Sequence, residues 1–196
     1  ESESGFKDAL TGIYLKLGTK TLYAGDLTYA YLDELAGLYS DYPGYNTNAV
    51  FNQSIVFDYE NMFLSKKNGI YSAMYNVIAN INNFLEYVDK NKDVLVTERY
   101  YETMKGEALG LRAFLHFDLL RMFGPIYKEH PASKAIPYRT TFDKDATPVL
   151  SANEVVDAIL KDLNAAEKLL KESDPLHFFT DQMGEELTEI NQFHQS

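Results

Sequence analysis

Neither cysteine nor tryptophan occurs in the 196 residues of this chain. Without cysteine the chain forms no disulfide, offers no thiol nucleophile and holds no metal through cysteine. Its aromatic side chains are 15 tyrosines and 12 phenylalanines. This abundance of tyrosine fits the packing of helices against one another, and it also fits stacking on the C–H faces of pyranose rings.

Basic side chains are few, since 18 lysines and arginines stand against 29 acidic residues and give a net charge of -11. The charges are scattered along the chain rather than gathered in blocks. Nucleic-acid phosphates and anionic lipid headgroups both demand a basic face on a protein. The sequence therefore predicts no nucleic-acid partner and no attraction to an anionic membrane surface.

No catalytic or cofactor-binding pattern is found. The histidines form neither an HExxH motif nor a close pair, which disfavours a metal site or a hydrolase; they are His116, His130, His177 and His194. No glycine-rich phosphate loop is present, and no spacing of acidic residues marks the carboxylate pair of a glycosidase. We therefore predict no catalytic residue, no metal and no cofactor.

Apolar residues recur with the 3.6-residue period of α-helices, so we expect an all-α fold. The predicted helices are 6–17, 27–39, 69–89, 97–123 and 152–171. Ser151 and Glu154 form a capping box for the last of them, whose expected buried face is Val155, Ile159, Leu163, Ala166 and Leu170. Asp26 or Thr28 is the expected cap of the second helix, and Thr97 that of the fourth.

The most apolar stretch, residues 108–123, contains charges that would each cost about 2.5 to 3.5 kcal/mol at the centre of a bilayer, so we expect a buried core helix. Gly106, Gly110 and Ala113 make a small-residue stripe against which another helix can pack closely. Gly124 and Pro125 end the helix. The expected core side chains are Phe114, Phe117, Leu120 and Phe123.

Four polar residues are predicted to have structural roles. A buried Arg112 must pair with a carboxylate or with several main-chain carbonyls. Asp118 and Arg121, three residues apart, are expected to form an ion pair on the same helix. The helix over 69–89 has a predicted apolar face that consists of Ile70, Met74, Val77, Ile78, Ile81, Phe84, Leu85 and Val88. Asn80 borders this face, and we expect it to tie this helix to a neighbouring loop or to contact a ligand directly.

Two long segments lack a helical period. Residues 40–52 bring together one proline, one glycine, three asparagines and two tyrosines, which predicts a loop, and a loop of this length is often functional. Residues 125–150 contain four prolines, at positions 125, 131, 137 and 148. Proline excludes regular helix and weakens strand pairing, so we expect an extended segment lying over the helices.

The stretch EALGLRAFLHFDLLRMFGPIY, residues 107–127, resembles the hallmark helix of the SusD/RagB family of surface glycan-binding lipoproteins of Bacteroidetes. The preceding helix, YSAMYNVIANINN, and the later stretch IPYRTTFDKDATPVLSANEVVDAILKDLNAAEKLL resemble the flanking motifs of that family. Together they cover residues 5 to 175 in the order of the family. Several separately spaced motifs agree, which makes the resemblance specific.

The resemblance implies irregular tetratricopeptide-like helical hairpins with long extended loops, in a SusD-like N-terminal helical domain over residues 1–175. Residues 176–196 are expected to be a polar tail, with the family's later region expected to be missing. The implied function is non-catalytic oligosaccharide binding at the outer membrane and delivery to a SusC-like TonB-dependent transporter. The resemblance also implies a surface-exposed protein of the outer membrane. Its membrane contact is expected to be an N-terminal lipid anchor that this chain does not contain.

The resemblance also directs attention to aromatics and amides on loops, the residue types that build the ligand platform in the family. The expected ligand-binding residues are Tyr42, Tyr45, Asn46 and Asn48, all within residues 40–52. An alternative function is a helical scaffold or protein-interaction module that binds no sugar; a hydrolase is the third and most remote. A glycan screen separates the first two.

Overall fold

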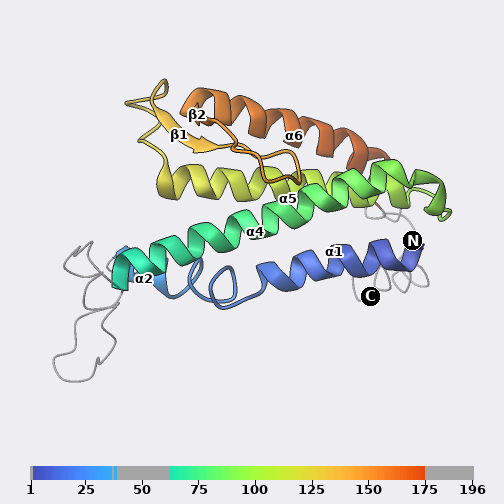
Figure 1. Ribbon diagram of the computed structural model, residues 1–196, viewed down its shortest axis with the longest axis horizontal. Helices are drawn as coiled ribbons and strands as arrows, with labels where there is room; N and C mark the ends of the chain where they lie inside the picture. Colours follow the sequence, from blue (N-terminus) through green and yellow to red (C-terminus); the bar gives the residue numbers. More distant parts are fainter. Residues whose placement is uncertain (1, 37, 39–61, 175–196) are drawn as a thin grey trace, which may run out of the picture. The chain divides into compact units, whose positions relative to one another are not determined.

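The structure, a computed structural model, describes residues 2–36, 38 and 62–174. These residues are mainly helical, which confirms the predicted fold class (Figure 1). The helices are α1 (Glu3–Leu17), α2 (Tyr31–Leu35), α4 (Met62–Lys90), the 3-10 turn η1 (Lys92–Val94), α5 (Tyr100–Phe123) and α6 (Ala152–Ser173). The predicted loop over 40–52 and the predicted tail over 176–196 lie outside the described residues.

The chain divides into two compact units, and α1 and α4 each pass from one to the other. Unit 1 comprises residues 1–13 and 78–196, and unit 2 comprises residues 14–77. The predicted division at residue 175 falls at the edge of the described residues and stays a prediction.

In unit 2 the second helix is much shorter than the predicted range 27–39. Residues 19–30 form successive turns that bury Leu22 and Leu27, and α2 begins only at Tyr31. The expected caps have other partners: the hydroxyl of Thr28 donates to the carbonyls of Tyr23 and Gly25, and the buried Asp26 forms an ion pair with Lys66 at 2.5 Å. Both polar side chains thus stabilise the turns and do not begin a helix.

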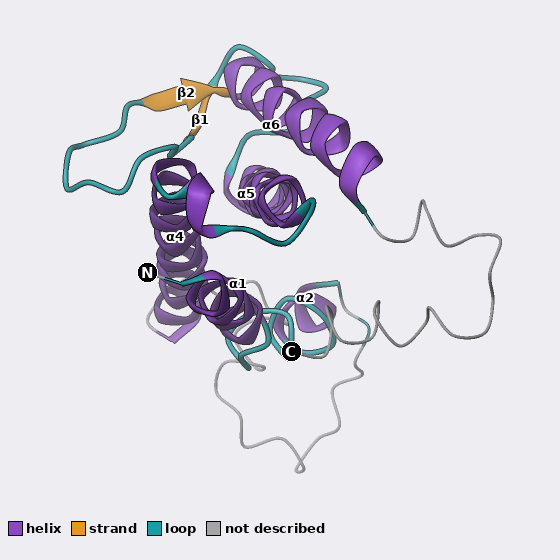
Figure 2. Cartoon of the chain, turned by 90° about the vertical axis from the view of Figure 1, so that its right-hand side faces the viewer, coloured by secondary structure: helices purple, strands orange, loops and turns teal. Residues whose placement is uncertain are grey.

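In unit 1, α5 lies between α6 and the C-terminal part of α4 (Figure 2). The apolar face predicted for α4 is confirmed, because all of its members are buried: Ile70, Met74, Val77, Ile78, Ile81, Phe84, Leu85 and Val88. Phe6 of α1 meets Phe84 edge-on, with ring centroids 6.0 Å apart. Thr97 does not cap α5; its hydroxyl and amide donate instead to the Glu3 carboxylate at 2.6 and 2.8 Å.

Close packing of α5 on α6 uses the predicted small residues. A Cβ placed on Gly106 would lie 2.8 Å from Cγ of Leu170, so only glycine allows this approach. A Cβ on Gly110 would meet that of Ala166 at 3.9 Å, an ordinary contact. At the start of α6, the Ser151 and Glu154 capping box is confirmed.

The predicted core of α5 is partly wrong. Phe114 and Phe117 are 44% and 46% exposed, Phe123 is half-buried, and only Leu120 of the four expected side chains is buried. The helix is apolar on almost every side, so its period does not mark which face packs inward. The buried face instead contains Met104, Ala108, Ala113, Leu115 and Leu119, with Arg112 and His116 among them.

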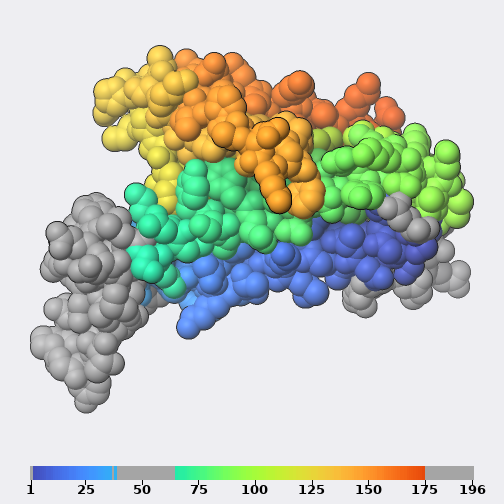
Figure 3. Space-filling view, in the orientation of Figure 1, coloured from blue at the N-terminus to red at the C-terminus, as the bar shows by residue number. Residues whose placement is uncertain are grey.

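The residues between α5 and α6 run over the outside of the helices, as predicted (Figure 3). Strands β1 (Lys134–Pro137) and β2 (Val149–Ser151) pair antiparallel within this extended segment, with an irregular register. Ile136 and Tyr138 point into unit 1 and are buried, whereas residues 140–146 are exposed. The paired strands β1 and β2 therefore hold together the two ends of the loop that connects them.

Candidate functional site

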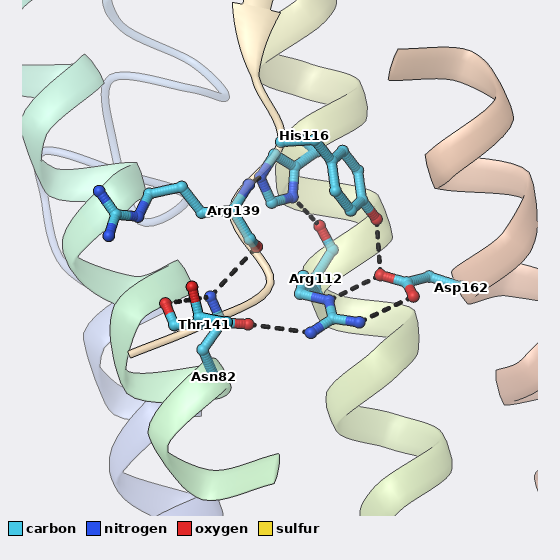
Figure 4. Close-up of polar contacts among 7 residues, drawn as sticks. Asn82, Arg112, His116, Arg139, Thr141 and Asp162 are labelled. Carbon is cyan, nitrogen blue, oxygen red and sulfur yellow. Dashed lines mark hydrogen bonds and ion pairs between the residues drawn. The ribbon is translucent and has the colours of Figure 1, made fainter. Parts of the chain in front are cut away.

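A buried ion pair lies at the centre of unit 1. Arg112 of α5 donates to the carboxylate of Asp162 on α6 through Nε at 2.6 Å and Nη2 at 2.8 Å. This two-point geometry matches the planar guanidinium to the carboxylate. Of the two kinds of partner predicted for Arg112, a carboxylate or several main-chain carbonyls, the structure has a carboxylate, that of Asp162 (Figure 4).

Asp162 lies in the buried stripe of α6, with Val155, Ile159 and Ala166. Leu163, predicted for this face, is 42% exposed, and Leu170 is half-buried. The hydroxyl of Tyr138 donates to the same Asp162 carboxylate at 2.6 Å. Burial, and then this hydrogen bond, raise the pKa of Tyr138, so the hydroxyl remains a donor.

Asn82 of α4 connects the ion pair to the extended segment. Its carbonyl oxygen accepts from Nη1 of Arg112 at 3.0 Å, and its amide donates to the main-chain carbonyls of Arg139 at 3.1 Å and Thr141 at 3.3 Å. The side chain is nearly fully buried, and both ends of its amide have partners. One amide thereby joins three separate parts of unit 1.

His116 completes this network, which we name the Arg112 cluster: Asn82, Arg112, His116, Tyr138 and Asp162. Nε2 of His116 accepts from the amide of Arg139 at 3.1 Å, so Nδ1 carries the proton and donates to the carbonyl of Arg112 at 2.8 Å. The ring stacks on Tyr138 with centroids 3.9 Å apart. Burial is the main cause that lowers the pKa of His116 to about 4, so the ring is neutral at pH 7.

A hollow of about 360 Å³ opens beside the Arg112 cluster. It is lined by Asn82, Leu85, Glu86, Asp89, Lys105, Leu109, Arg112, Thr140 and Thr141. Lys105 donates to Asp89 at 2.7 Å and to the hydroxyl of Tyr101 at 3.0 Å. Burial acts to lower the pKa of Lys105, but these hydrogen bonds raise it overall, so the ammonium stays charged. The lining of the hollow is therefore mixed, with paired charges beside the apolar surface of two leucines.

The other predicted residues are not brought into this site. Asp118 and Arg121 form the expected pair at 3.1 Å, but on the surface of α5, where Arg121 is exposed. Asn80 is half-buried, and the amide that ties α4 to the extended segment is Asn82. Tyr42, Tyr45, Asn46 and Asn48 lie outside the described residues. Their predicted roles stay predictions.

Sequence reasoning missed Asn82, Tyr138 and Asp162. Asp162 was detectable, because it stands three residues after Ile159 and four before Ala166, on the apolar stripe of α6. A charged residue in such a stripe requires a buried partner of opposite charge. Asn82 and Tyr138 carry no comparable signal, because their contacts depend on how the extended segment crosses α4.

No cluster of three metal-binding side chains occurs among the described residues. In the same part of the chain, no helix has both the length and the apolar character needed to cross a membrane. The arrangement can hold the extended segment in place and offer polar groups to a small ligand at its edge.

Comparison with known proteins identifies the relatives of the chain. The SusD-like family model described as "Starch-binding associating with outer membrane" matches residues 7–181. A SusD-like protein, P38, of Formosa agariphila is 44% identical over 75 residues, which cover 36% of this chain and 13% of that protein. The family resemblance seen in the sequence is confirmed.

Solved structures give the same fold. A SusD superfamily protein of Bacteroides thetaiotaomicron superimposes with a TM-score of 0.66 at 17% identity over 86% of this chain. One from Bacteroides fragilis gives 0.65 at 22% identity over 84% of this chain. The chain spans only 37% and 38% of those two proteins.

Proposed function

Because this chain belongs to the SusD-like family, we propose that it is a non-catalytic protein that binds oligosaccharide at the outer membrane. The observation that carries the proposal is the family match over residues 7–181, which includes the hallmark helix α5 and the extended segment after it. The family is one of starch-binding proteins associated with the outer membrane.

Delivery to a transporter is the second part of the proposal. The bound oligosaccharide passes to a SusC-like TonB-dependent transporter, and an N-terminal lipid anchor holds the protein on the outside of the outer membrane. Support comes from the family description, which names the outer membrane. Pull-down of the SusC-like transporter from detergent-solubilised membranes tests this part, and failure to recover the transporter contradicts it.

The proposed ligand platform is the segment over residues 40–52, which the sequence predicts to be a loop. Tyr42 and Tyr45 offer flat faces for sugar stacking, and Asn46 and Asn48 offer amide donors and acceptors. Each aromatic face contributes roughly 0.5 to 1.5 kcal/mol, so two of them give weak binding. Affinity then depends on further contacts elsewhere on the protein.

Isothermal titration with a panel of plant and host oligosaccharides tests the function. We expect at least one oligosaccharide to bind and the Tyr42→Ala/Tyr45→Ala variant to bind it more weakly. Unchanged binding in this variant would remove the loop from the site while keeping the function. If the wild-type chain binds no sugar, the protein is instead a helical scaffold or protein-interaction module.

A further inference from the structure

We infer that the hollow beside the Arg112 cluster is a separate carbohydrate position that takes one neutral sugar ring. The inference rests on the proposed oligosaccharide binding, and it places a contact far along the chain from residues 40–52. It is argued from the size, the charges, the apolar wall and the rigidity of the hollow, all within unit 1.

Size limits the ligand to a small group. The hollow measures about 360 Å³, near the small end of the roughly 300 to 1,000 Å³ typical of ligand pockets. It is partly open to solvent, so a ring can enter while the rest of an oligosaccharide stays outside. A terminal or branching sugar unit of an oligosaccharide is small enough for the hollow, and several consecutive sugar units are not.

The charges favour a neutral, hydroxyl-rich ligand. Two carboxylates, Glu86 and Asp89, stand in the same wall as the ammonium of Lys105. Asp89 pairs with Lys105 at 2.7 Å, and Glu86 pairs with Lys90. An anion would meet the carboxylates and a cation would meet the ammonium. Sugar hydroxyls both donate and accept, so they can bond to either kind of group.

The floor of the hollow offers fixed polar groups. The guanidinium of Arg112 has five N–H groups, of which Asp162 and Asn82 accept three. A second N–H on Nη1 can therefore donate to a ligand hydroxyl. Because the Arg112 cluster fixes the guanidinium and Asn82 on both sides, these groups lose little conformational freedom on binding.

Apolar surface for a sugar C–H face is present as well. Leu85 and Leu109 line the hollow, and Phe142, 55% exposed, follows directly on the lining residue Thr141. The loop bearing Phe142 is held by Arg139, whose Nη2 donates to the carbonyl of Asp143 at 2.9 Å and to its carboxylate at 3.2 Å. Phe142 does not line the hollow itself, so its exposed ring can stack only on a sugar unit that stays outside the hollow.

The test uses the whole chain with glucose, galactose, mannose and xylose, and with the oligosaccharides that contain them. Amide chemical shifts in a nitrogen-15 NMR titration locate the ligand directly. We expect saturable shifts in residues 85–89, 105–112 and 140–142. Saturable shifts confined to other residues would overturn the inference, and so would the absence of any saturable shift.

Substitutions provide the second measurement. Lys105→Met and Phe142→Ala should each weaken binding about tenfold, the loss expected for one charged hydrogen bond or one stacking contact. The matched controls are Lys161→Met on the exposed face of α6 and Phe117→Ala on α5, and both should bind like the wild type. Circular dichroism melts verify that all four variants fold.

The outcomes separate the two proposals. Binding that survives Lys105→Met and Phe142→Ala but is lost in Tyr42→Ala/Tyr45→Ala overturns the hollow and keeps the proposed function. Binding lost in the hollow variants and kept in the controls supports the hollow. Absence of binding to every sugar overturns both proposals.

Discussion

Arg112 and Asp162 illustrate what a buried ion pair demands at the scale of single residues. Each is less than 10% exposed, and each is the partner of the other. Removing one partner leaves a buried, uncompensated charge, which costs about 3 to 5 kcal/mol. We expect Arg112→Ala to lose this much unfolding free energy in urea denaturation. Arg112→Met should lose less, because methionine retains the packing of the side-chain stem.

The control is Arg121→Met, which removes an exposed guanidinium from its pair with the half-buried Asp118 at the surface of α5. Surface ion pairs contribute about 0 to 1 kcal/mol, so this change should be nearly neutral. Equal losses for Arg112→Ala and Arg112→Met would show that the charge alone determines the stability and that stem packing does not.

His116 makes the stability of the protein depend on pH. Its folded-state pKa of about 4 lies below the ordinary value of 6.5, so the unfolded chain binds the proton more readily. The contribution is complete above about pH 6.5 and is lost as the pH falls through about 4. The groups that contact the ring include the carbonyl of Arg112, the amide of Arg139 and the ring of Tyr138, and Asp162 lies behind Arg112.

Between about pH 7 and about pH 5, this residue should remove roughly 2 kcal/mol of unfolding free energy. Urea titrations at several pH values measure the slope. His116→Gln lowers stability at pH 7 but should lose most of the slope, whereas the exposed His130→Gln should keep it. The same slope in His116→Gln as in the wild type would exclude His116 as its source.

Phe117 and Leu119 show how a pattern that is apolar on every side misleads. Phe117 is half-exposed and lies beside Arg121, whose guanidinium is 5.5 Å from the ring centroid, whereas Leu119 is fully buried. We expect Phe117→Ala to cost about 1 kcal/mol or less, and Leu119→Ala to cost about 2 to 5 kcal/mol. Thermal and urea unfolding of the two variants decide this, and the reverse order would mean that α5 buries the other face.

At the scale of elements, the sequence predicted the helices with strong periods and failed where local contacts compete. The predicted apolar face of α4 was correct at every position, because its Ile, Met, Phe, Leu and Val residues recur at helical spacings of three and four among polar residues. The second helix was predicted too long. Asp26 pairs with Lys66, and the hydroxyl of Thr28 bonds to main-chain carbonyls that precede it in the chain, so neither residue caps a helix. These long-range and turn contacts leave no periodic mark on the sequence.

The two glycines of α5 provide a matched pair of tests for its packing on α6. Gly110→Ala should stabilise the protein by about 0.5 to 1 kcal/mol, because alanine restricts the unfolded chain and its Cβ makes an ordinary contact. Gly106→Ala should destabilise it, since the Cβ would lie within 3 Å of two Leu170 atoms. Stabilisation by both changes would show that α6 can shift away from α5 at little cost.

At the scale of the whole molecule, the sequence identified the family and the fold but not the Arg112 cluster that fixes the extended segment. Arg112 was recognisable in the sequence because it is a charged residue in an apolar helix. Burying an unpaired charge costs free energy, so a partner could be predicted for it. The identity of that partner depends on which face of α6 turns inward. The sequence analysis placed Leu163 on the buried face, whereas the structure buries its neighbour Asp162. Burial of Asn82 depends in turn on the path of residues 139–141.

Net charge leads to a prediction about the kind of oligosaccharide. The chain carries -11, and a polyanionic glycan would be repelled at long range, whereas a neutral one would not. Raising the salt from about 0.01 M to about 1 M shortens the Debye length from roughly 30 Å to 3 Å and removes long-range repulsion. For the best-binding oligosaccharide of the panel, we therefore expect the dissociation constant to change less than about twofold across this range. Titration calorimetry at both salt concentrations measures the dissociation constant.

Two other outcomes would contradict this prediction. Affinity that rises with salt would indicate an anionic ligand bound despite the negative net charge of the chain. Affinity that falls with salt would indicate a local basic site, which the hollow does not provide because its Lys105 is paired with Asp89.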